Sequence, residues 1–228
     1  MNKDPEKLSV AELAKYFDHT LLNPGASRAD IVRLCQEARQ WKVASVCVHP
    51  IWVKEAHVEL VGSGVPVCTV IGFPHGATAY PALEAETARA IEDGAHEFDM
   101  VIPYGIGRSE SWDYVEANVR AVKEAAGTFT VKAILETSEL NDHDIRKAAE
   151  AAVRGGADFL KTSTGFASGG ATIDAVTILA EVADGKIGVK ASGGIRTYQD
   201  AMAMIKAGAT RIGASATVAI LQQARDNQ

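Results

Sequence analysis

The stretch AAEAAVRGGADFLK, residues 148–161, shows how this chain is built. An alanine-rich helical run ends at Gly156, and a short apolar run follows at once. A glycine at such a junction can take the left-handed conformation that ends a helix. The same junction recurs at Gly94-Ala95 and at Gly208-Ala209. This recurrence indicates an internal repeat of one supersecondary unit, in which a helix leads directly into a strand.

Eight short apolar runs carry the strand signal. They are rich in Val, Ile, Thr and Phe and are mostly apolar throughout, which is typical of parallel strands buried on both faces. The stretches between them have helical spacing, and their starts are marked by a hydroxyl residue three positions before an acid. These starts are Ser9 with Glu12, Ser27 with Asp30 and Thr197 with Asp200, and Thr172 before Ile173 marks another. The apolar runs are residues 17–22, 43–48, 66–71, 96–102, 129–135, 158–162, 187–191 and 210–213.

Eight strands that alternate with helices in 228 residues predict an α/β fold, a (β/α)8 TIM barrel with one extra N-terminal helix. We expect a single domain over residues 1–228, because no proline- or serine-rich linker divides the chain. A doubly wound open sheet is the competing architecture, but no G-x-G-x-x-G follows the first strand. In a barrel the chemistry lies at the carboxyl ends of the strands and in the loops that follow them.

The composition is that of an ordinary globular protein and excludes several classes. With 23 Lys and Arg against 29 Asp and Glu the net charge is −6, and the basic residues are scattered, so we expect no nucleic acid partner. No apolar run reaches the roughly 18 residues that a membrane span needs. The first residues, MNKDPEKLSVAEL, lack the apolar core of a secretory signal. The odd, widely spaced set Cys35, Cys47 and Cys68 indicates reduced thiols, and we expect a cytoplasmic protein.

Three lysines lie inside expected strands, at Lys132, Lys161 and Lys190. Successive lysines are 29 residues apart, about one strand–helix unit, so we expect them at comparable levels on three successive strands. Lysine is among the residues that are least often buried. A single such lysine is most simply explained by a stem that crosses the barrel rim or by an ion pair. Three of them in register favour a chemical role.

Schiff-base formation is the chemistry that needs this arrangement. A lysine amine attacks a carbonyl only when it is deprotonated, and an unperturbed pKa of about 10.4 leaves almost none in that form at neutral pH. Removal from water and a second cation nearby both lower the pKa of a lysine. Lys161 and Lys190 would supply both effects to each other on adjacent strands. The residues alone leave open which of the two is the nucleophile.

Two carboxylates in apolar strands are candidates for proton transfer, which Schiff-base chemistry requires. Asp99 lies in EFDMVI and Asp18 lies in FDHTLL. Either carboxylate is equally well explained by hydrogen bonds to backbone groups at the end of the barrel. Beside the lysines, Asp99 is the stronger candidate.

Small-residue loops after the last two strands indicate a phosphate site. Ser192-Gly193-Gly194 follows the seventh strand, and Gly213-Ala214-Ser215 follows the eighth and opens the last helix. In a TIM barrel these two loops often bind phosphate through backbone N–H groups and a helix N-terminus. Thr164-Gly165, after the sixth strand, is in a position to add to this site. Each glycine alone is equally typical of a tight turn, but two such loops at the two expected places favour a phosphate monoester substrate.

Taken together, these stretches resemble the deoxyribose-phosphate aldolases. The most specific are KTSTG at 161–165, VKASGGIR at 189–196 and EFDMV at 97–101. The likeness extends to FDHTLL at 17–22, CTVIGFPHG at 68–76, VKAILET at 131–137 and GATRIGAS at 208–215, and SVCVHP at 45–50 is compatible with it.

The resemblance implies a metal-independent class I aldolase without a cofactor. Such an enzyme cleaves 2-deoxy-D-ribose 5-phosphate reversibly to D-glyceraldehyde 3-phosphate and acetaldehyde, a step of deoxyribonucleotide catabolism. By position, the resemblance implies that Lys161 is the Schiff-base nucleophile and that Lys190 is the cation that keeps Lys161 neutral. It implies that Asp99 relays protons and that Asp18 supports the network. The residues that it places around the phosphate and hydroxyl groups of the substrate are Thr164, Gly165, Gly193, Gly194 and Ser215.

Three positions depart from the family pattern. After EFDMV the family usually continues I-N-[IV]-G, whereas this chain has Ile102-Pro103-Tyr104-Gly105, so we expect a differently shaped loop. Asn23 stands where the family often has a lysine, and Phe166 stands where some relatives have a lysine or another phosphate-facing residue. These changes leave the catalytic set intact and bear on phosphate affinity and aldehyde preference.

Three other functions compete with this one. A class II aldolase would polarise the carbonyl with a histidine-bound metal, but His19, His49, His75 and His96 lack metal-motif spacing. A class I aldolase of the same mechanism would act on a different phosphorylated sugar. A non-catalytic phosphosugar-binding barrel would not need the two lysines with Asp99. The tryptophans of the helices fit either a homodimer face or ordinary half-buried packing, and they are Trp41, Trp52 and Trp112.

Overall fold

The computed structural model describes residues 8–226, which form a closed barrel of eight parallel strands. The strands follow one another around the barrel in chain order, and β8 closes the barrel by pairing with β1. Each strand lies within a few residues of its predicted range, so the TIM barrel is confirmed. The strands are β1 (Phe17–Leu21), β2 (Ser45–Val48), β3 (Val67–Ile71), β4 (Glu97–Val101), β5 (Thr130–Ile134), β6 (Phe159–Lys161), β7 (Gly188–Ser192) and β8 (Arg211–Ala214).

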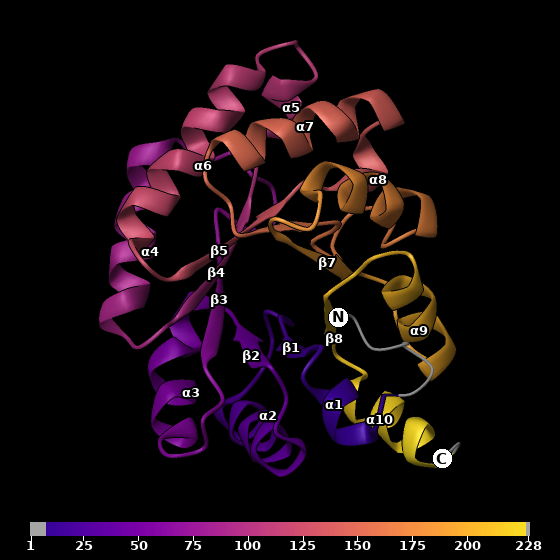
Figure 1. The fold of residues 1–228 in the computed structure, drawn as a ribbon. Helices are drawn as coiled ribbons and strands as arrows, with labels where there is room; N and C mark the ends of the chain where they lie inside the picture. The colour runs from indigo at the N-terminus through magenta and orange to yellow at the C-terminus, as the bar shows by residue number, and fades with distance from the viewer. Residues whose placement is uncertain (1–7, 227–228) are drawn as a thin grey trace.

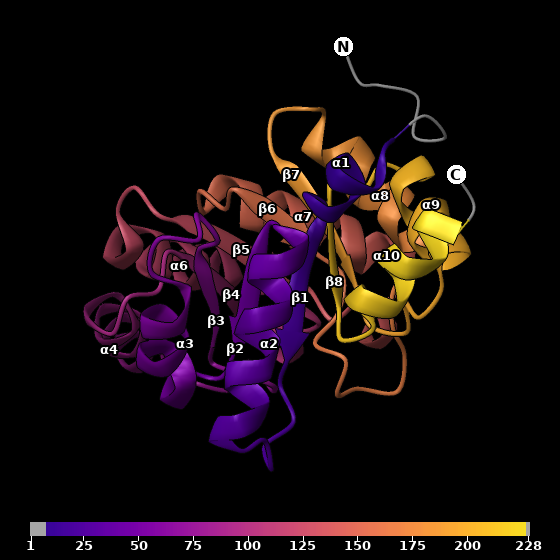
Figure 2. The same ribbon diagram turned by 90° about the horizontal axis from the view of Figure 1, so that it is seen from below.

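Helices surround the barrel and cover the outer face of its strands (Figure 1). The expected extra helix at the N-terminal end is α1, which lies against α10 (Figure 2). In the described part of the chain, none of the helices is both long and apolar enough to cross a membrane. The helices are α1 (Val10–Ala14), α2 (Arg28–Trp41), α3 (Val53–Leu60), α4 (Tyr80–Glu92), α5 (Tyr104–Gly107), α6 (Trp112–Ala126), α7 (Asp142–Arg154), α8 (Ile173–Ala183), α9 (Tyr198–Lys206) and α10 (Thr217–Asp226), with the 3-10 turns η2 (Pro50–Trp52) and η3 (Thr137–Glu139).

The helices begin where the capping residues predict. Ser9, Ser27 and Thr197 each accept a hydrogen bond from the backbone N–H three residues on, and the acid at that position accepts one in return from the backbone N–H of the cap. Thr172 caps α8 by accepting from the N–H of Ala175. These reciprocal bonds satisfy N–H groups that have no partner inside the helix.

The predicted glycine junctions have the left-handed backbone that ends a helix. The φ angles of Gly94, Gly156 and Gly208 are 104°, 90° and 114°. At Gly208 a Cβ atom would lie 2.6 Å from the Cβ of Ala180 on α8. Both the backbone conformation and the close packing therefore require a glycine here.

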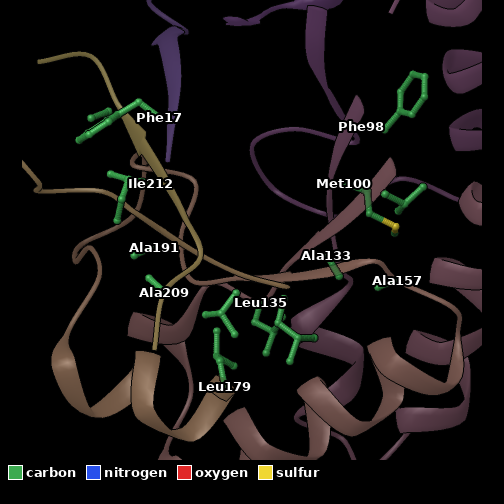
Figure 3. Close-up of a cluster of buried hydrophobic side chains, with 14 of the residues drawn as sticks. Phe17, Phe98, Met100, Ala133, Leu135, Ala157, Leu179, Ala191, Ala209 and Ile212 are labelled. Carbon is green, nitrogen blue, oxygen red and sulfur yellow. The ribbon is translucent and has the colours of Figure 1, made fainter. Parts of the chain in front are cut away.

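The hydrophobic core lies between the barrel and the helices. Alternate residues of each strand face outward, and among them Phe17, Phe98, Met100 and Ile212 belong to the same core cluster as Leu179 of α8 (Figure 3). Because these apolar residues face the helices, the residues that alternate with them along each strand face the inside of the barrel.

The inward-facing residues form three layers in which most side chains are polar or charged. In a TIM barrel each layer takes four residues from alternate strands, because neighbouring strands are staggered. The pairing register and the contacts between the side chains give these layers. From the amino ends of the strands upward, the lower layer holds Ser45, Glu97, Phe159 and Arg211, the middle layer holds Asp18, Cys68, Lys132 and Lys190, and the upper layer holds Cys47, Asp99, Lys161 and Gly213.

Candidate active site

The three strand lysines occupy two adjacent layers of the barrel interior. Lys161 pairs directly with Lys190 in the register of β6 and β7, whereas Lys132 pairs with Phe159. With the stagger of the strands, Lys132 and Lys190 share the middle layer and Lys161 lies one layer above them. The 29-residue spacing therefore places Lys132 and Lys190 at one level and Lys161 one layer higher. Lys161 is the lysine nearest the carboxyl ends of the strands, where TIM barrels have their chemistry.

Asp99 joins the two candidate lysines through one oxygen atom. Its Oδ2 atom accepts from the Nζ of Lys161 at 2.7 Å and from the Nζ of Lys190 at 2.6 Å. Its Oδ1 atom accepts from the Nζ of Lys132 at 2.9 Å and from the thiol of Cys68 at 3.1 Å. Asp99 is fully buried. The sequence-predicted trio of Lys161, Lys190 and Asp99 thus forms a single hydrogen-bonded group.

Below this trio lies an ion-pair network that sequence reasoning resolved only in part. Asp18 accepts from Lys190 at 2.5 Å and from the Nη1 of Arg211 at 2.6 Å. Glu97 pairs with Lys132 at 2.5 Å and with Arg211 at 3.1 Å. Arg211 and Glu97 were not singled out, although each is a charged residue in an expected strand, which is the criterion that found the lysines. The network fixes Lys190 and Lys132 from below.

Burial disfavours each charge in this network, and the charges persist because they stabilise one another. The carboxylates of Asp18 and Asp99 outweigh the effect of burial and raise the pKa of Lys190 above its ordinary value. Asp99, Asp18 and Glu97 likewise raise the pKa of Lys132 against burial. In return, the lysines hold the pKa of Asp18 and that of Asp99 below the ordinary range, although burial alone would raise both. Lys132 and Lys190 are therefore cations at neutral pH.

Lys161 differs from the other two lysines in its surroundings. Its ammonium contacts one carboxylate, that of Asp99, whereas Lys190 contacts two. The side chain of Lys161 is 4 % exposed and those of Lys132 and Lys190 are 0 % exposed. Lys161 also lines a cavity of about 350 Å³ at the carboxyl ends of the strands. Of the three amines, that of Lys161 is the one that a substrate in this cavity reaches.

The same cavity brings together the loops predicted to bind phosphate. Gly165, Gly193, Gly194 and Ser215 all line it, and Ser215 lies just before the N-terminus of α10. The loop after β6 packs tightly on the loop after β7, since the N–H of Ala171 donates to the carbonyl of Gly193 at 3.0 Å. Backbone N–H groups and a helix N-terminus are suited to an anion. Arg196, at the end of the VKASGGIR motif, adds a cation to the lining that sequence reasoning did not single out.

Thr164 lines the cavity but uses its hydrogen-bond donors elsewhere. Its hydroxyl donates to Oε2 of Glu136 at 2.5 Å, and its backbone N–H lies 3.2 Å and 3.3 Å from the two oxygens of the same carboxylate. Both donors of Thr164 are therefore directed at Glu136, while the residue itself lines the cavity. Glu136 was not singled out in the sequence, where it follows an apolar strand with no glycine beside it.

Three of the four histidines considered for a metal-dependent aldolase have separate partners in the structure. His19 pairs with Glu37 at 2.7 Å, the Nε2 atom of His49 lies 2.9 Å from the carbonyl oxygen of Leu22, and His96 stacks on His57. Within residues 8–226, the clusters of potential metal ligands contain no histidine. They are Cys47, Cys68 and Asp99, and Asp18, Cys68 and Glu97, whose carboxylates already bind lysine or arginine.

The chain is similar to known aldolases in sequence and in fold. The family model described as "DeoC/LacD family aldolase" matches residues 12–223. The chain belongs to this family of aldolases. It is 51 % identical over 211 residues to a deoxyribose-phosphate aldolase of Streptococcus gordonii, covering 92 % of this chain and 96 % of that protein. A deoxyribose-phosphate aldolase of Macrococcus caseolyticus is 53 % identical over the same shares. The deoxyribose phosphate aldolase of Aeropyrum pernix, solved as a tetramer, superposes with a TM-score of 0.87 at 33 % identity, covering 96 % of this chain and 94 % of that chain.

Two of the three departures from the pattern of the aldolase family, Asn23 and Phe166, line the cavity. Pro103 precedes the short helix α5, which begins at Tyr104 and reshapes the loop after β4. Asn23 lines the cavity, and its side-chain oxygen accepts from the N–H of Gly25 at 2.9 Å. Phe166 lines the cavity and packs edge-on against Phe73, 5.2 Å between ring centres. Neither Asn23 nor Phe166 is basic, so the basic side chains that line this cavity are those of Lys161 and Arg196.

Proposed function

We propose that this aldolase is a deoxyribose-phosphate aldolase, which cleaves 2-deoxy-D-ribose 5-phosphate reversibly to D-glyceraldehyde 3-phosphate and acetaldehyde. One observation carries the proposal: Lys161 and Lys190 share a single oxygen of Asp99 at the floor of a cavity lined by glycine-rich loops. An amine at the floor of the cavity can attack a substrate carbonyl, and the glycine-rich loops can bind a phosphate group. The high identity to proteins of that name over nearly the whole chain supports the same substrate.

In the direction of synthesis, the neutral amine of Lys161 attacks the carbonyl carbon of acetaldehyde. The carbinolamine that forms loses water to give an imine between Lys161 and the former aldehyde carbon. Lys190 stays charged, because Asp18 and Asp99 hold its proton. The nucleophile must carry a lone pair, and Lys190 is the neighbouring cation proposed to support Lys161 in this role.

Asp99 is suited to move the protons of these steps. Its Oδ2 atom already lies 2.7 Å from the Nζ of Lys161, within the range of direct proton exchange. Loss of a proton from the methyl carbon of the protonated imine gives a neutral enamine. The enamine carbon then forms the new bond to the aldehyde carbon of D-glyceraldehyde 3-phosphate. Hydrolysis of the resulting imine releases the deoxysugar phosphate and returns Lys161 to the free amine.

The phosphate is proposed to lie between the loops after β6, β7 and β8. Gly165, Gly193, Gly194 and Ser215 offer small residues at the cavity surface, and Arg196 offers a positive charge. Phosphate bound there sits apart from the carboxylate of Glu136, whose oxygens are turned to Thr164. This binding places the aldehyde end of the substrate toward Lys161.

Borohydride trapping tests the proposal. Wild-type protein incubated with acetaldehyde and borohydride should gain one reduced adduct on Lys161, located by peptide mass spectrometry, and EDTA should not change the yield. Lys161→Leu should remain folded and lose both adduct and turnover. Lys186→Leu is the matched control, because Lys186 is exposed and paired only with Asp184 at the surface. A protein that loses activity in EDTA and gives no adduct would be a metal-dependent enzyme.

The alternative within the same mechanism is a different phosphorylated sugar. The departures at Asn23 and Phe166 lie in the cavity and bear on this choice. Retro-aldol cleavage measured across a panel of phosphorylated deoxy- and keto-sugars distinguishes the two. The proposal requires 2-deoxy-D-ribose 5-phosphate to give the highest kcat/KM of the panel.

We also propose a cytoplasmic homodimer. Cys35, Cys47 and Cys68 are buried and unpaired, which suits a reducing compartment.

The aromatic side chains do not by themselves mark a dimer face, because Trp112 is buried and Trp41 and Trp52 pack against the core. Light scattering on the purified chain measures the number of subunits directly.

A further inference from the structure

Glu136 has a backbone conformation that is unusual for a buried residue. Its φ and ψ angles are 56° and 61°, in the left-handed region that side chains with a Cβ disfavour. Among residues 8–226, the other non-glycine residues with positive φ are Lys42, Glu110 and Asp184, and all three are exposed. Glu136 is 1 % exposed and follows β5 at its carboxyl end, beside the active site. A disfavoured conformation kept at such a place points to a function.

The carboxylate of Glu136 is directed at a single residue of the KTSTG segment. It accepts from both the N–H and the hydroxyl of Thr164, and the Thr164 hydroxyl oxygen in turn accepts from the N–H of Phe166 at 3.0 Å. Residues 164–166 are thereby fixed from below by one carboxylate. Gly165, in the middle of this segment, has a φ of 84° and faces the cavity with Lys161.

Thr164 also separates Glu136 from the cavity. Burial is the main influence on Glu136 and raises its pKa, while the bonds from Thr164 and the charge of Lys161 favour the ionised form. A carboxylate open to the cavity would repel a phosphate. Because its oxygens are taken up by the two donors of Thr164, the charge holds the loop in place without facing the substrate.

We propose that Glu136 is a positioning residue for the substrate phosphate. By binding both donors of Thr164, it holds residues 164–166 so that Gly165 presents its backbone to the phosphate. This inference rests on the proposed function, since it assigns a part of the phosphate site. It also explains why Thr164, a candidate phosphate ligand by sequence, has no donor left for the ligand.

Glu136→Gln is the variant that tests this role. Glutamine has the same size but is neutral, and its NH₂ group replaces one acceptor oxygen, so the bonds from Thr164 lose their charge-assisted strength. We expect KM for 2-deoxy-D-ribose 5-phosphate and the inhibition constant of inorganic phosphate to rise about tenfold or more. The yield of the borohydride-reduced acetaldehyde adduct on Lys161 should stay unchanged, because that reaction involves no phosphate.

The matched control is Glu139→Gln. Glu139 lies three residues further on, is only partly buried, and accepts from the hydroxyl of Ser168 at 3.0 Å. The control removes the same charge from the same turn. It should leave KM for the sugar phosphate and the inhibition constant of inorganic phosphate at their wild-type values. In the double variant of Glu136→Gln and Thr164→Val, the second substitution should add less than it does in the wild-type background, because both act on the bond from the Thr164 hydroxyl to Glu136.

Glu136→Gly covers the case in which the glutamine variant folds poorly. Glycine adopts positive φ freely, so this variant removes the carboxylate without backbone strain. It should show the same rise in KM and a melting temperature no lower than that of Glu136→Ala. The proposal is overturned if the melting temperature falls while both constants stay at wild-type values, or if adduct formation falls as much as phosphate binding. A wild-type protein that gives no adduct would instead refute the proposed function.

Discussion

Lys190→Met removes the cation that Asp18 and Asp99 hold beside Lys161. In the wild-type protein the Nζ atoms of Lys190 and Lys161 both lie within 2.7 Å of the Oδ2 atom of Asp99. In the variant, this oxygen keeps Lys161 as its partner, and Asp18 keeps Arg211. Asp99 then has Lys161 on Oδ2 and Lys132 on Oδ1 as its cationic partners. We therefore expect Asp99 to hold the amine of Lys161 more tightly and the rate of Schiff-base formation to fall.

The size of the effect follows from the distance between the two amines. Two nitrogens that share one oxygen at these distances are about 5 Å apart or less, and unit charges at that separation repel by about 3 kcal/mol at an effective dielectric constant of about 20. Loss of this repulsion corresponds to about a hundredfold less turnover at pH 7. Removing one partner from a buried ion pair also costs about 3–5 kcal/mol of stability.

The assay is kcat/KM for retro-aldol cleavage from pH 6 to pH 10, together with urea unfolding of each variant. Lys132→Met is the matched control, because it also removes a fully buried cation but one that contacts Asp99 through Oδ1. Both variants should lose similar stability, and Lys190→Met should show the larger loss at pH 7 and the larger recovery toward alkaline pH. An unchanged pH profile in folded Lys190→Met would refute the role given to Lys190.

The remaining predictions concern the other parts of the structure. Asp99→Asn should lower kcat by about a hundredfold to ten-thousandfold, because it removes the proton-transfer group, and stopped-flow turnover measures this. Arg196→Met should raise KM for the phosphorylated sugar about tenfold by removing a cation from the phosphate loops, and should leave cleavage of unphosphorylated 2-deoxyribose unaltered. Lys190, Lys132 and Arg211 lower the pKa of Asp18 against the effect of burial, so its ionised form stabilises the fold above about pH 4 and this stability is lost as the pH falls. Asp18→Asn should therefore lower the unfolding free energy at pH 7 and flatten its decline below about pH 4, as urea titrations at several pH values would show. Gly208→Ala should lower the unfolding free energy by about 1–3 kcal/mol, and by more than Gly127→Ala, where a Cβ meets nothing within 4 Å.

The fold was predictable because each of its rules is local. A capping box such as Ser27 with Asp30 satisfies N–H groups within one helical turn, and Gly156 ends a helix through its own backbone conformation. Once eight such units alternate, few architectures bury all the strands, and the barrel is the one that uses eight. The shortest strand, β6, ends at Lys161, earlier than its apolar run predicts, because the chain turns there into the loop that lines the cavity.

The candidate residues of the site can be picked out from the sequence, but the contacts between them cannot. A charged residue in an apolar strand marks Lys161, Lys190 and Asp99 without any knowledge of the structure. The spacing along the chain does not show which lysine lies nearest the cavity, because this depends on the stagger between strands. Nothing in the sequence marks the left-handed backbone of Glu136, where a glycine would have given a signal. The bond from Glu136 to Thr164 joins two loops that are 28 residues apart, so it depends on the closed barrel.

The charged interior of the barrel links stability to reactivity. Among the inward-facing residues of the described strands, four can carry a positive charge and three a negative one, so the layers balance when one of the four gives up its proton. Arg211 does not do so, because a guanidinium stays protonated in proteins. Lys190 would give up contacts with two carboxylates, and Lys132 contacts with Asp99 and Glu97, whereas Lys161 would give up one. Of the three lysines, the one at the cavity is therefore held by the fewest carboxylates. Under the proposed mechanism this amine is the nucleophile, and a substitution that strengthens the contact of Lys161 with Asp99 should stabilise the protein and slow the reaction.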